Sequence, residues 1–322
     1  MKSNVSIASA SLNRKANFAA KKKLALKRFN EGKYLLLLFL PCLVYYIIFR
    51  YLPMYGIIIS FKDYNLFRGV FASKWVGLKY YRMFVNNPDS FEIIRNTFLL
   101  GVYKLFWGFP APIMFALVLN EVRNIKFKRV VQTISYLPHF MSTVVVVGML
   151  LQFLSPRSGF INRIIMSLGG DMINFMSDPG WFRTVYIASG IWRSVGWSAI
   201  IYLAALTSID TSLYEAAIID GANKFRQIWH VTLPGIANTI ITLFILDTGN
   251  VLDIGFEKVF LMYNPAIYET ADVIGTYVYR VGLVQGNFSY ATAIGLSKSL
   301  VSLVIVAAAN YLARKFSDTS IW

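Results

Sequence analysis

The chain has 322 residues, of which 56% are hydrophobic and 15% are charged, and its mean hydropathy is +0.53. Soluble domains carry about 25% charged residues, so the composition excludes an ordinary water-soluble protein and indicates a membrane protein. The formal net charge of +16 is high enough for a nucleic-acid partner. The bases, however, gather beside apolar segments, which favours the inner surface of a membrane and no nucleic acid.

The chain opens with a basic segment rich in Ser and Ala, residues 1–33, which we expect to be a cytoplasmic tail near anionic lipid. Its bases before the first apolar run are Arg14, Lys15, Lys21, Lys22, Lys23, Lys27, Arg28 and Lys33. A signal peptide has its apolar region nearer to the start and a cleavage site soon after it. The apolar run here is too long for one, so we interpret it as the first membrane span.

Six apolar runs are long enough for membrane-spanning helices, which need roughly 20 residues each. They cover residues 34–61, 92–120, 127–153, 183–206, 235–255 and 289–313. The sequence therefore predicts an all-α, polytopic membrane protein, with a six-helix transmembrane domain over residues 34–316 and a short cytoplasmic tail over residues 317–322. With both termini in the cytoplasm, the basic clusters at 123–129 and 314–315 also lie inside, as the positive-inside rule expects.

Three longer segments are expected outside the spans on the opposite side, at residues 62–91, 154–182 and 256–288. The first also carries several bases, but long loops contribute less to the positive-inside rule. Its Trp and Tyr residues are typical of a membrane interface. These segments are either a face that meets a partner protein or plain solvated connectors, and the sequence leaves both interpretations open.

Charged residues occur inside the expected spans, where each costs about 2.5–3.5 kcal/mol and therefore usually faces a cavity or a partner. Lys104, Arg193 and Lys298 are basic, and Asp247 is acidic. One interpretation is a structural ion pair of Asp247 with Arg193 or Lys298. The other is a polar pathway, and the surplus of bases would then favour an acidic substrate.

Aromatic residues near these charges suit a route for sugars, whose apolar ring faces stack on aromatic rings. The candidates for the substrate pathway are Tyr103, Lys104, Trp107, Trp192, Arg193, Trp197 and Lys298. Aromatic residues in spans more often face lipid or pack against other helices. Both roles remain open for each of them.

A polar island at residues 215–236 separates the fourth and fifth apolar runs. It begins with Glu215, Ala216 and Ala217, continues with Asp220, Gly221 and Ala222, and ends with Leu233 and Pro234. Small residues permit close approach by another protein. Gly221 suits the left-handed position that closes a helix.

This island resembles the EAA loop of the permease subunits of binding-protein-dependent ABC importers. The matching residues are Glu215, Ala216, Ala217, Asp220, Gly221, Ala222, Leu233 and Pro234. Ile228 and Val231 replace the usual Phe and Ile conservatively. The resemblance implies that residues 207–236, called the coupling loop here, dock onto a cytoplasmic ATPase. It also implies six helices per subunit, two permease subunits in one pathway and an extracytoplasmic binding protein.

Further segments resemble permeases for complex oligosaccharides. They are the stretches at 50–64, 135–140, 255–258, 263–272 and 277–280. This resemblance implies a subunit of an oligosaccharide importer in a bacterial cytoplasmic (inner) membrane. The surplus of bases inside the expected spans is what points to an acidic, uronate-containing oligosaccharide.

Several other functions lack support in the sequence. No Walker motif is present, so ATP and Mg would be bound by a partner ATPase dimer and the chain itself needs no cofactor. The single Cys42 allows no disulfide within the chain and no cysteine-based metal cluster. No nucleophile–base pair indicates an enzyme. A secondary sugar transporter is the alternative, but the sequence shows no repeat between its halves.

Overall fold

The computed structural model describes residues 32–316. Residues 1–31, which hold most of the expected basic tail, and the expected tail at 317–322 lie outside the described residues. The chain divides into two compact units, Met1–Ile58 and Ile59–Trp322.

The first unit contains most of an apolar helical segment, Gly32–Phe61, with a mean hydropathy of 2.1 in its most apolar window. Towards its end the helix changes type: η1 (Ile47–Tyr51) is a π-helix, α2 (Leu52–Met54) is α-helical and η2 (Tyr55–Phe61) is a 3-10 helix. Residues Ile59 to Phe61 of η2 belong to the second unit. Pro53 lies inside this continuous helical segment, where its missing N–H removes one hydrogen bond of the helix, and the irregular helical turns lie on either side of it. The segment is long enough to cross a bilayer core.

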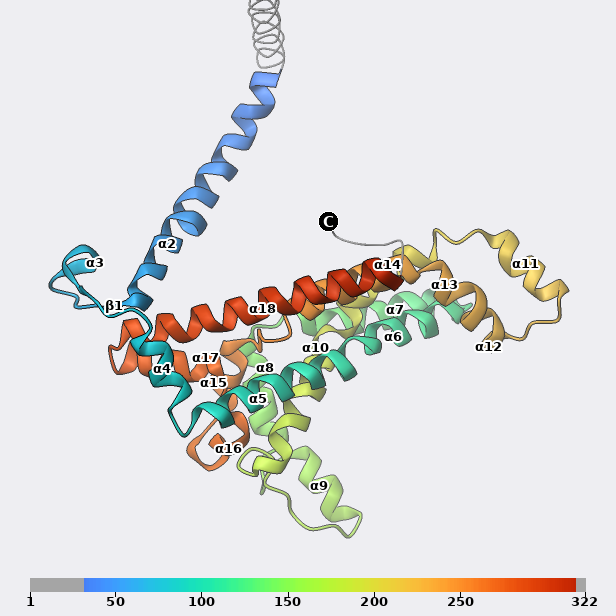
Figure 1. Ribbon diagram of the computed structural model, residues 1–322. Coiled ribbons are helices and arrows are strands. Elements are labelled where there is room, and N and C mark those ends of the chain that lie inside the picture. The colour runs from blue at the N-terminus through green and yellow to red at the C-terminus, as the bar shows by residue number, and fades with distance from the viewer. Residues whose placement is uncertain (1–31, 317–322) are drawn as a thin grey trace, which may run out of the picture. The chain divides into compact units, whose positions relative to one another are not determined.

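The second unit is mostly helical (Figure 1). Its strands β1 (Lys62–Asp63) and β2 (Lys74–Trp75) form an antiparallel pair, in the register Lys62↔Trp75. The longer helices are α5 (Ser90–Tyr103), α6 (Pro110–Glu121), α7 (Ile125–Tyr136), α8 (Thr143–Phe153), α10 (Pro179–Leu206), α14 (Ala237–Gly249) and α18 (Phe288–Phe316).

Shorter helices connect these. Before α10 they are α3 (Gly69–Ala72), α4 (Lys79–Val85), η3 (Lys104–Gly108), η4 (Leu137–Phe140) and α9 (Phe160–Ser167). After α10 they are α11 (Thr211–Ile219), α12 (Lys224–Gln227), η5 (Ile228–Thr232), α13 (Leu233–Gly235), α15 (Phe256–Met262), η6 (Pro265–Ile267), α16 (Tyr268–Ala271), α17 (Ile274–Tyr279) and η7 (Arg280–Val284).

Within residues 32–316, three helical segments are long and apolar enough to cross a membrane, namely Gly32–Phe61, Ser90–Glu121 and Phe288–Lys315. Two bent pairs, Ile125–Phe140 with Thr143–Phe153 and Lys224–Gly235 with Ala237–Gly249, raise the number to five if each pair is one span. The expected run at 183–206 lies within α10, which falls outside this set.

The run expected as the third span, residues 127–153, is not one straight helix, because the chain bends by 103° between α7–η4 and α8. Met141 and Ser142 are extended, with ψ of 139° and 152°, and such residues end a helix. The Ser142 side chain then caps α8 by accepting a hydrogen bond from the Val145 N–H, at 3.3 Å. Pro138 precedes the bend, in the first turn of η4.

The run expected as the fifth span, residues 235–255, is only partly helical. α14 ends at Gly249, and a 64° bend separates it from the preceding helices. Residues 250–255 leave the helix and lead into α15. The last part of the expected span is therefore a connector.

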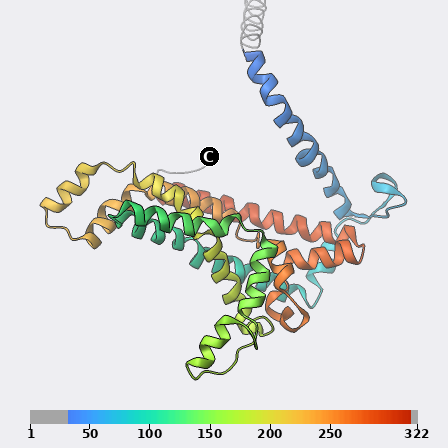
Figure 2. The same ribbon diagram turned by 180° about the vertical axis from the view of Figure 1, so that it is seen from behind.

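α10 is the central packing element of the second unit. It packs against α6 and α7, while α14 packs against α18 (Figures 1 and 2). A Cβ added at Gly196 would lie 2.4 Å from the backbone oxygen of Ser135, so the close approach of α10 to α7 requires glycine. Asp178 caps α10 by accepting from the Gly180 N–H, at 2.8 Å.

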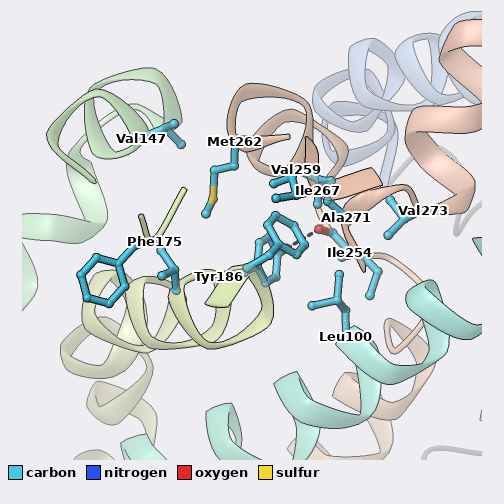
Figure 3. Packing of buried hydrophobic residues seen from close by; sticks show 12 residues of the cluster. Leu100, Val147, Phe175, Tyr186, Ile254, Val259, Met262, Ile267, Ala271 and Val273 are labelled. Atoms are coloured by element: carbon cyan, nitrogen blue, oxygen red, sulfur yellow. Dashed lines mark hydrogen bonds between the residues drawn. The ribbon is translucent and has the colours of Figure 1, made fainter. Parts of the chain in front are cut away.

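The largest buried apolar cluster lies at one end of α10 (Figure 3). It joins Leu100 of α5, Val147 of α8, Tyr186 of α10 and Val259 of α15, among others. The Tyr186 hydroxyl donates a hydrogen bond to the carbonyl oxygen of Ile254. This hydrogen bond fixes the connector that follows α14 beside α10, and α15 with it.

Candidate functional site

The first part of the coupling loop forms α11 and a closed helix end. Glu215, Ala216 and Ala217 lie on α11, and Gly221 follows with a φ of +74°. The Ala222 N–H donates to the Ala217 oxygen at 2.8 Å, and the Gly221 N–H donates to the Ile218 oxygen at 3.0 Å. This is the Schellman arrangement that the position of Gly221 predicts.

The second part of the coupling loop returns the chain to the helical body. Asn223 caps α12, and the Gln227 side chain donates to the Ala222 oxygen at 2.8 Å. Leu233 and Pro234 lie on α13, with Pro234 in its first turn. Lys224 forms an ion pair with Glu121 at the end of α6, with 3.1 Å between nitrogen and oxygen. The loop is thus connected to α6.

Large apolar side chains of the coupling loop point into solvent. This set, the coupling patch, consists of Leu213, Ile218, Ile219, Phe225 and Trp229, each more than half exposed. Ile219 reaches 85% exposure. Five large apolar side chains exposed within one short loop are typical of an interaction site, so the composition of the loop surface suits a docking element.

A cavity of about 900 Å³, the central cavity, lies between α10 and the helices around it. Its charged and ring-bearing lining includes Lys104, His139, Arg193, Trp197, Asp247 and Lys258. Three basic side chains, Lys104, Arg193 and Lys258, therefore share the cavity with one carboxylate, that of Asp247. This balance favours an anionic or a polar occupant over an apolar one.

The structure brings three of the seven predicted pathway residues into the central cavity: Lys104, Arg193 and Trp197. Trp192 instead lines a second cavity of about 430 Å³ beside α8, with apolar walls. Trp107 is 59% exposed and Tyr103 is 37% exposed, and neither lines the central cavity.

Lys298 does not line the central cavity either. Its ammonium lies 3.6 Å from a carboxylate oxygen of Asp253. The suggested partner Asp247 is therefore wrong for Lys298, and Asp253 takes that place because the connector after α14 passes beside α18.

Arg193 does not pair with Asp247 either. It donates to the Thr143 hydroxyl at 3.1 Å and to the Met141 oxygen at 2.8 Å. Both acceptors lie at the bend between η4 and α8. The guanidinium therefore holds the bend while one of its edges lines the cavity.

Lys258 is the cavity residue that the sequence interpretation missed. Its ammonium donates to the Tyr186 oxygen at 2.7 Å and lies 4.4 Å from the centre of the Tyr186 ring. α15 lies outside the candidate spans. Burial, together with the charges of Arg193 and Lys104, lowers the pKa of Lys258 to about 7. The stretch 255–258 contributed to the resemblance, but the place of Lys258 in the cavity could not be predicted, because its partner Tyr186 lies 72 residues away.

His139 also lines the cavity, and its ring stacks on that of Trp197, so one side chain both packs η4 against α10 and forms part of the cavity wall. The other histidine, His230, contacts the Arg226 oxygen through Nδ1 at 3.1 Å within the coupling loop.

The comparisons with known proteins agree with this arrangement. Residues 108–318 match the family described as "Binding-protein-dependent transport system inner membrane component". The chain belongs to this family. It is therefore an inner-membrane permease component of an importer and not an enzyme. The family confirms the prediction of an ABC importer subunit and not the alternative, a secondary transporter.

Two relatives match nearly the whole chain. Protein LplB of Bacillus subtilis (strain 168) is 48% identical over 298 residues, which are 92% of this chain and 93% of LplB. The polygalacturonan/rhamnogalacturonan transport system permease protein YteP of the same strain is 47% identical over 302 residues, 94% of each chain.

A solved structure has the same fold. The structure titled a bacterial alginate ABC transporter in complex with alginate pentasaccharide-bound periplasmic protein contains a chain that is 40% identical, with a TM-score of 0.85. The match covers 92% of this chain and 99% of that one. The resemblance to oligosaccharide permeases is thereby confirmed.

Proposed function

We propose that this chain is one of two permease subunits of an ABC importer for acidic oligosaccharides, and that the central cavity forms part of their route. The observation that carries the substrate class is the lining of this cavity, where Lys104, Arg193 and Lys258 face one carboxylate, Asp247. In a site with little water, such a surplus lowers the energy of a passing carboxylate.

The names of two relatives support the same chemistry. YteP is named for polygalacturonan and rhamnogalacturonan, and a solved transporter that is 40% identical, with a TM-score of 0.84, is described as importing the acidic polysaccharide alginate. Polygalacturonan is a chain of uronic acids. Uronate-containing fragments are accordingly the substrate class proposed here.

The partners follow from the importer class. A second permease subunit would complete the pathway, a cytoplasmic ATPase dimer would bind ATP and Mg, and an extracytoplasmic sugar-binding protein would deliver the sugar. The coupling loop is the proposed ATPase contact, through the exposed coupling patch and the pattern from Glu215 to Pro234. Membrane lipid would surround the spans.

The proposed topology has six spans with both termini in the cytoplasm. Two arguments support it: the basic clusters at 123–129 and 314–315, and the need for the coupling loop to reach a cytoplasmic ATPase. α10, with 28 residues, has the length of a sixth span despite Arg183 and Arg193.

Reconstitution tests the proposal. The complete assembly, with binding protein, is placed in liposomes, and uptake of a labelled oligogalacturonate is measured with ATP present and absent. ATP-dependent uptake of the acidic sugar is expected. Uptake without ATP would support a secondary transporter instead, and uptake of neutral oligosaccharides with no uptake of acidic ones would disprove the substrate class.

A further inference from the structure

The ammonium of Lys258 is held at the wall of the central cavity with part of its hydrogen-bonding capacity in use. It donates to the Tyr186 oxygen at 2.7 Å. A Cβ added at the neighbouring Gly190 would lie 3.5 Å from this ammonium, so the missing side chain leaves space beside it. An ammonium has three N–H donors. Two remain for other acceptors.

The other bases near the cavity already have partners. Arg193 donates to Thr143 and Met141, and Lys298 forms its ion pair with Asp253. Lys104 is exposed, and its ammonium lies 3.4 Å from the Asp253 backbone oxygen. Within residues 32–316, Lys258 has no carboxylate partner in an ion pair. A partly buried cation without a counter-charge is costly.

We propose that Lys258 is the specificity-determining residue of the cavity, whose ammonium binds the carboxylate of a uronate as the oligosaccharide passes. This inference rests on the proposed function. The passing carboxylate supplies the counter-charge that the chain does not, and it accepts a charge-assisted hydrogen bond, which is stronger than one between neutral groups. A neutral sugar gains nothing comparable from Lys258.

The surroundings of Lys258 make the contact sensitive to pH. The groups around the cavity are Tyr186 and Arg193 of α10, Lys104 of η3, His139 of η4, Asp247 of α14 and Asp253 of the connector, with Glu257 next to Lys258 on α15. Burial and the charges of Arg193 and Lys104 lower the pKa of Lys258 to about 7. The empty site loses its proton above this pH, whereas a bound carboxylate favours the protonated form, so affinity for uronates falls as pH rises.

The test compares uptake of an oligogalacturonate with uptake of its methyl-esterified, neutral counterpart by the reconstituted assembly. The variants are Lys258→Gln, Lys258→Arg and, as a control, Lys79→Gln, which removes an equal charge from the exposed pair with Asp63. The same binding protein serves every variant, so its own preference cancels. Assembly and melting temperature are checked for each variant.

We expect Lys258→Gln to raise KM for the acidic sugar about tenfold or more and to leave the neutral sugar unchanged. Lys258→Arg should retain acidic uptake and weaken its decline between about pH 6 and pH 8. Since His139 lines the same cavity, His139→Gln is made both in the parent protein and in Lys258→Arg. The comparison separates any pH dependence caused by His139 from that caused by Lys258. Equal losses for both sugars, or no loss in a well-assembled Lys258→Gln, would overturn the inference while the importer stands. Failure of the unaltered assembly to import the acidic sugar would refute the proposed substrate class instead.

Discussion

The ring of His139 lies flat against the ring of Trp197, with 4.6 Å between their centres and 4° between their planes. This stack joins η4, at the bend before α8, to the middle of α10. Arg193, one turn earlier on α10, donates to Met141 and Thr143 on the far side of the bend. One helix therefore fixes the directions of both arms of the bend.

The close contact between α10 and α7 predicts a difference between two glycine variants. Gly196→Ala forces the backbone at Ser135 to move, because the new Cβ would lie 2.4 Å from its oxygen, and overpacking of this kind costs about 1–3 kcal/mol. Gly148→Ala on α8 is the matched control, since nothing lies within 4 Å of its Cβ. The melting temperature of the detergent-solubilised subunit should fall only for Gly196→Ala. Equal melting temperatures would contradict the packing.

The left-handed Gly221 predicts a graded series in the coupling loop. Nothing in the chain lies within 4 Å of a Cβ at Gly221, so the cost of Ala or Val is backbone strain, about 1–2 kcal/mol. Asn tolerates this conformation better. Substrate-stimulated ATP hydrolysis by the assembly should fall in the order Gly, Asn, Ala, Val, and the melting temperature of the isolated subunit should fall in the same order by a few degrees.

A larger side chain, as in Gly221→Trp, should abolish transport while the protein still reaches the membrane. Because nothing in the chain lies within 4 Å of a Cβ at Gly221, we expect the steric loss beyond that of Gly221→Val to come from contact with a partner protein. A fully coupled Gly221→Trp variant would refute the docking role of the loop.

The ion pair between Arg280 and Asp272 predicts a large loss of stability when one partner is removed. Their nitrogen and oxygen are 2.5 Å apart, and the Asp272 side chain is only 11% exposed. Arg280→Met removes the charge partner of this carboxylate, which keeps the hydrogen bond from the Thr276 hydroxyl at 2.7 Å, and should destabilise the subunit by about 3 kcal/mol. Adding Asp272→Asn should restore part of the loss in melting temperature.

A surface pair provides the comparison for this ion pair. Lys79 and Asp63 are each more than half exposed and 3.8 Å apart, so Lys79→Met should cost less than about 1 kcal/mol. A loss as large as that of Arg280→Met would show that burial does not set the cost.

The buried Tyr80 predicts a loss of stability at high pH. Burial, followed by its hydrogen bond to Asp63, raises the pKa of Tyr80 to about 12. In the unfolded chain the Tyr80 hydroxyl ionises with its ordinary pKa of about 10. Between about pH 10 and pH 12 the folded protein therefore binds more protons than the unfolded chain, and stability falls as pH rises. Tyr80→Phe should be less stable than the parent at neutral pH and show a shallower decline over this window, measured by thermal melting. An unchanged slope would remove Tyr80 as a cause.

Sequence reasoning located the helices well and their bends poorly. Runs of apolar residues report which segments are buried or meet lipid, and they placed α5–α6 and α18 closely. The bend at Met141 depends on two extended residues and on a donor, Arg193, far along the chain. No local pattern encodes such a contact.

The candidate site divides in the same way. The motif from Glu215 to Ala222 predicted the helix end at Gly221, because that geometry is local. Lys258 was missed, and Lys298 proved to pair with Asp253, because both depend on how the connector after α14 folds back. The ligand contacts of the pathway residues stay predictions.

The bend also has a consequence for how the protein is made. Met141 leaves the ribosome 52 residues before Arg193, its hydrogen-bond donor, an interval of about 3 to 10 seconds at ordinary rates of bacterial synthesis. Exposed non-helical carbonyl groups are not tolerated in contact with lipid. Where the bend lies at membrane depth, the newly made α7 and α8 would need a hydrated or chaperoned environment until α10 emerges and Arg193 can donate to Met141.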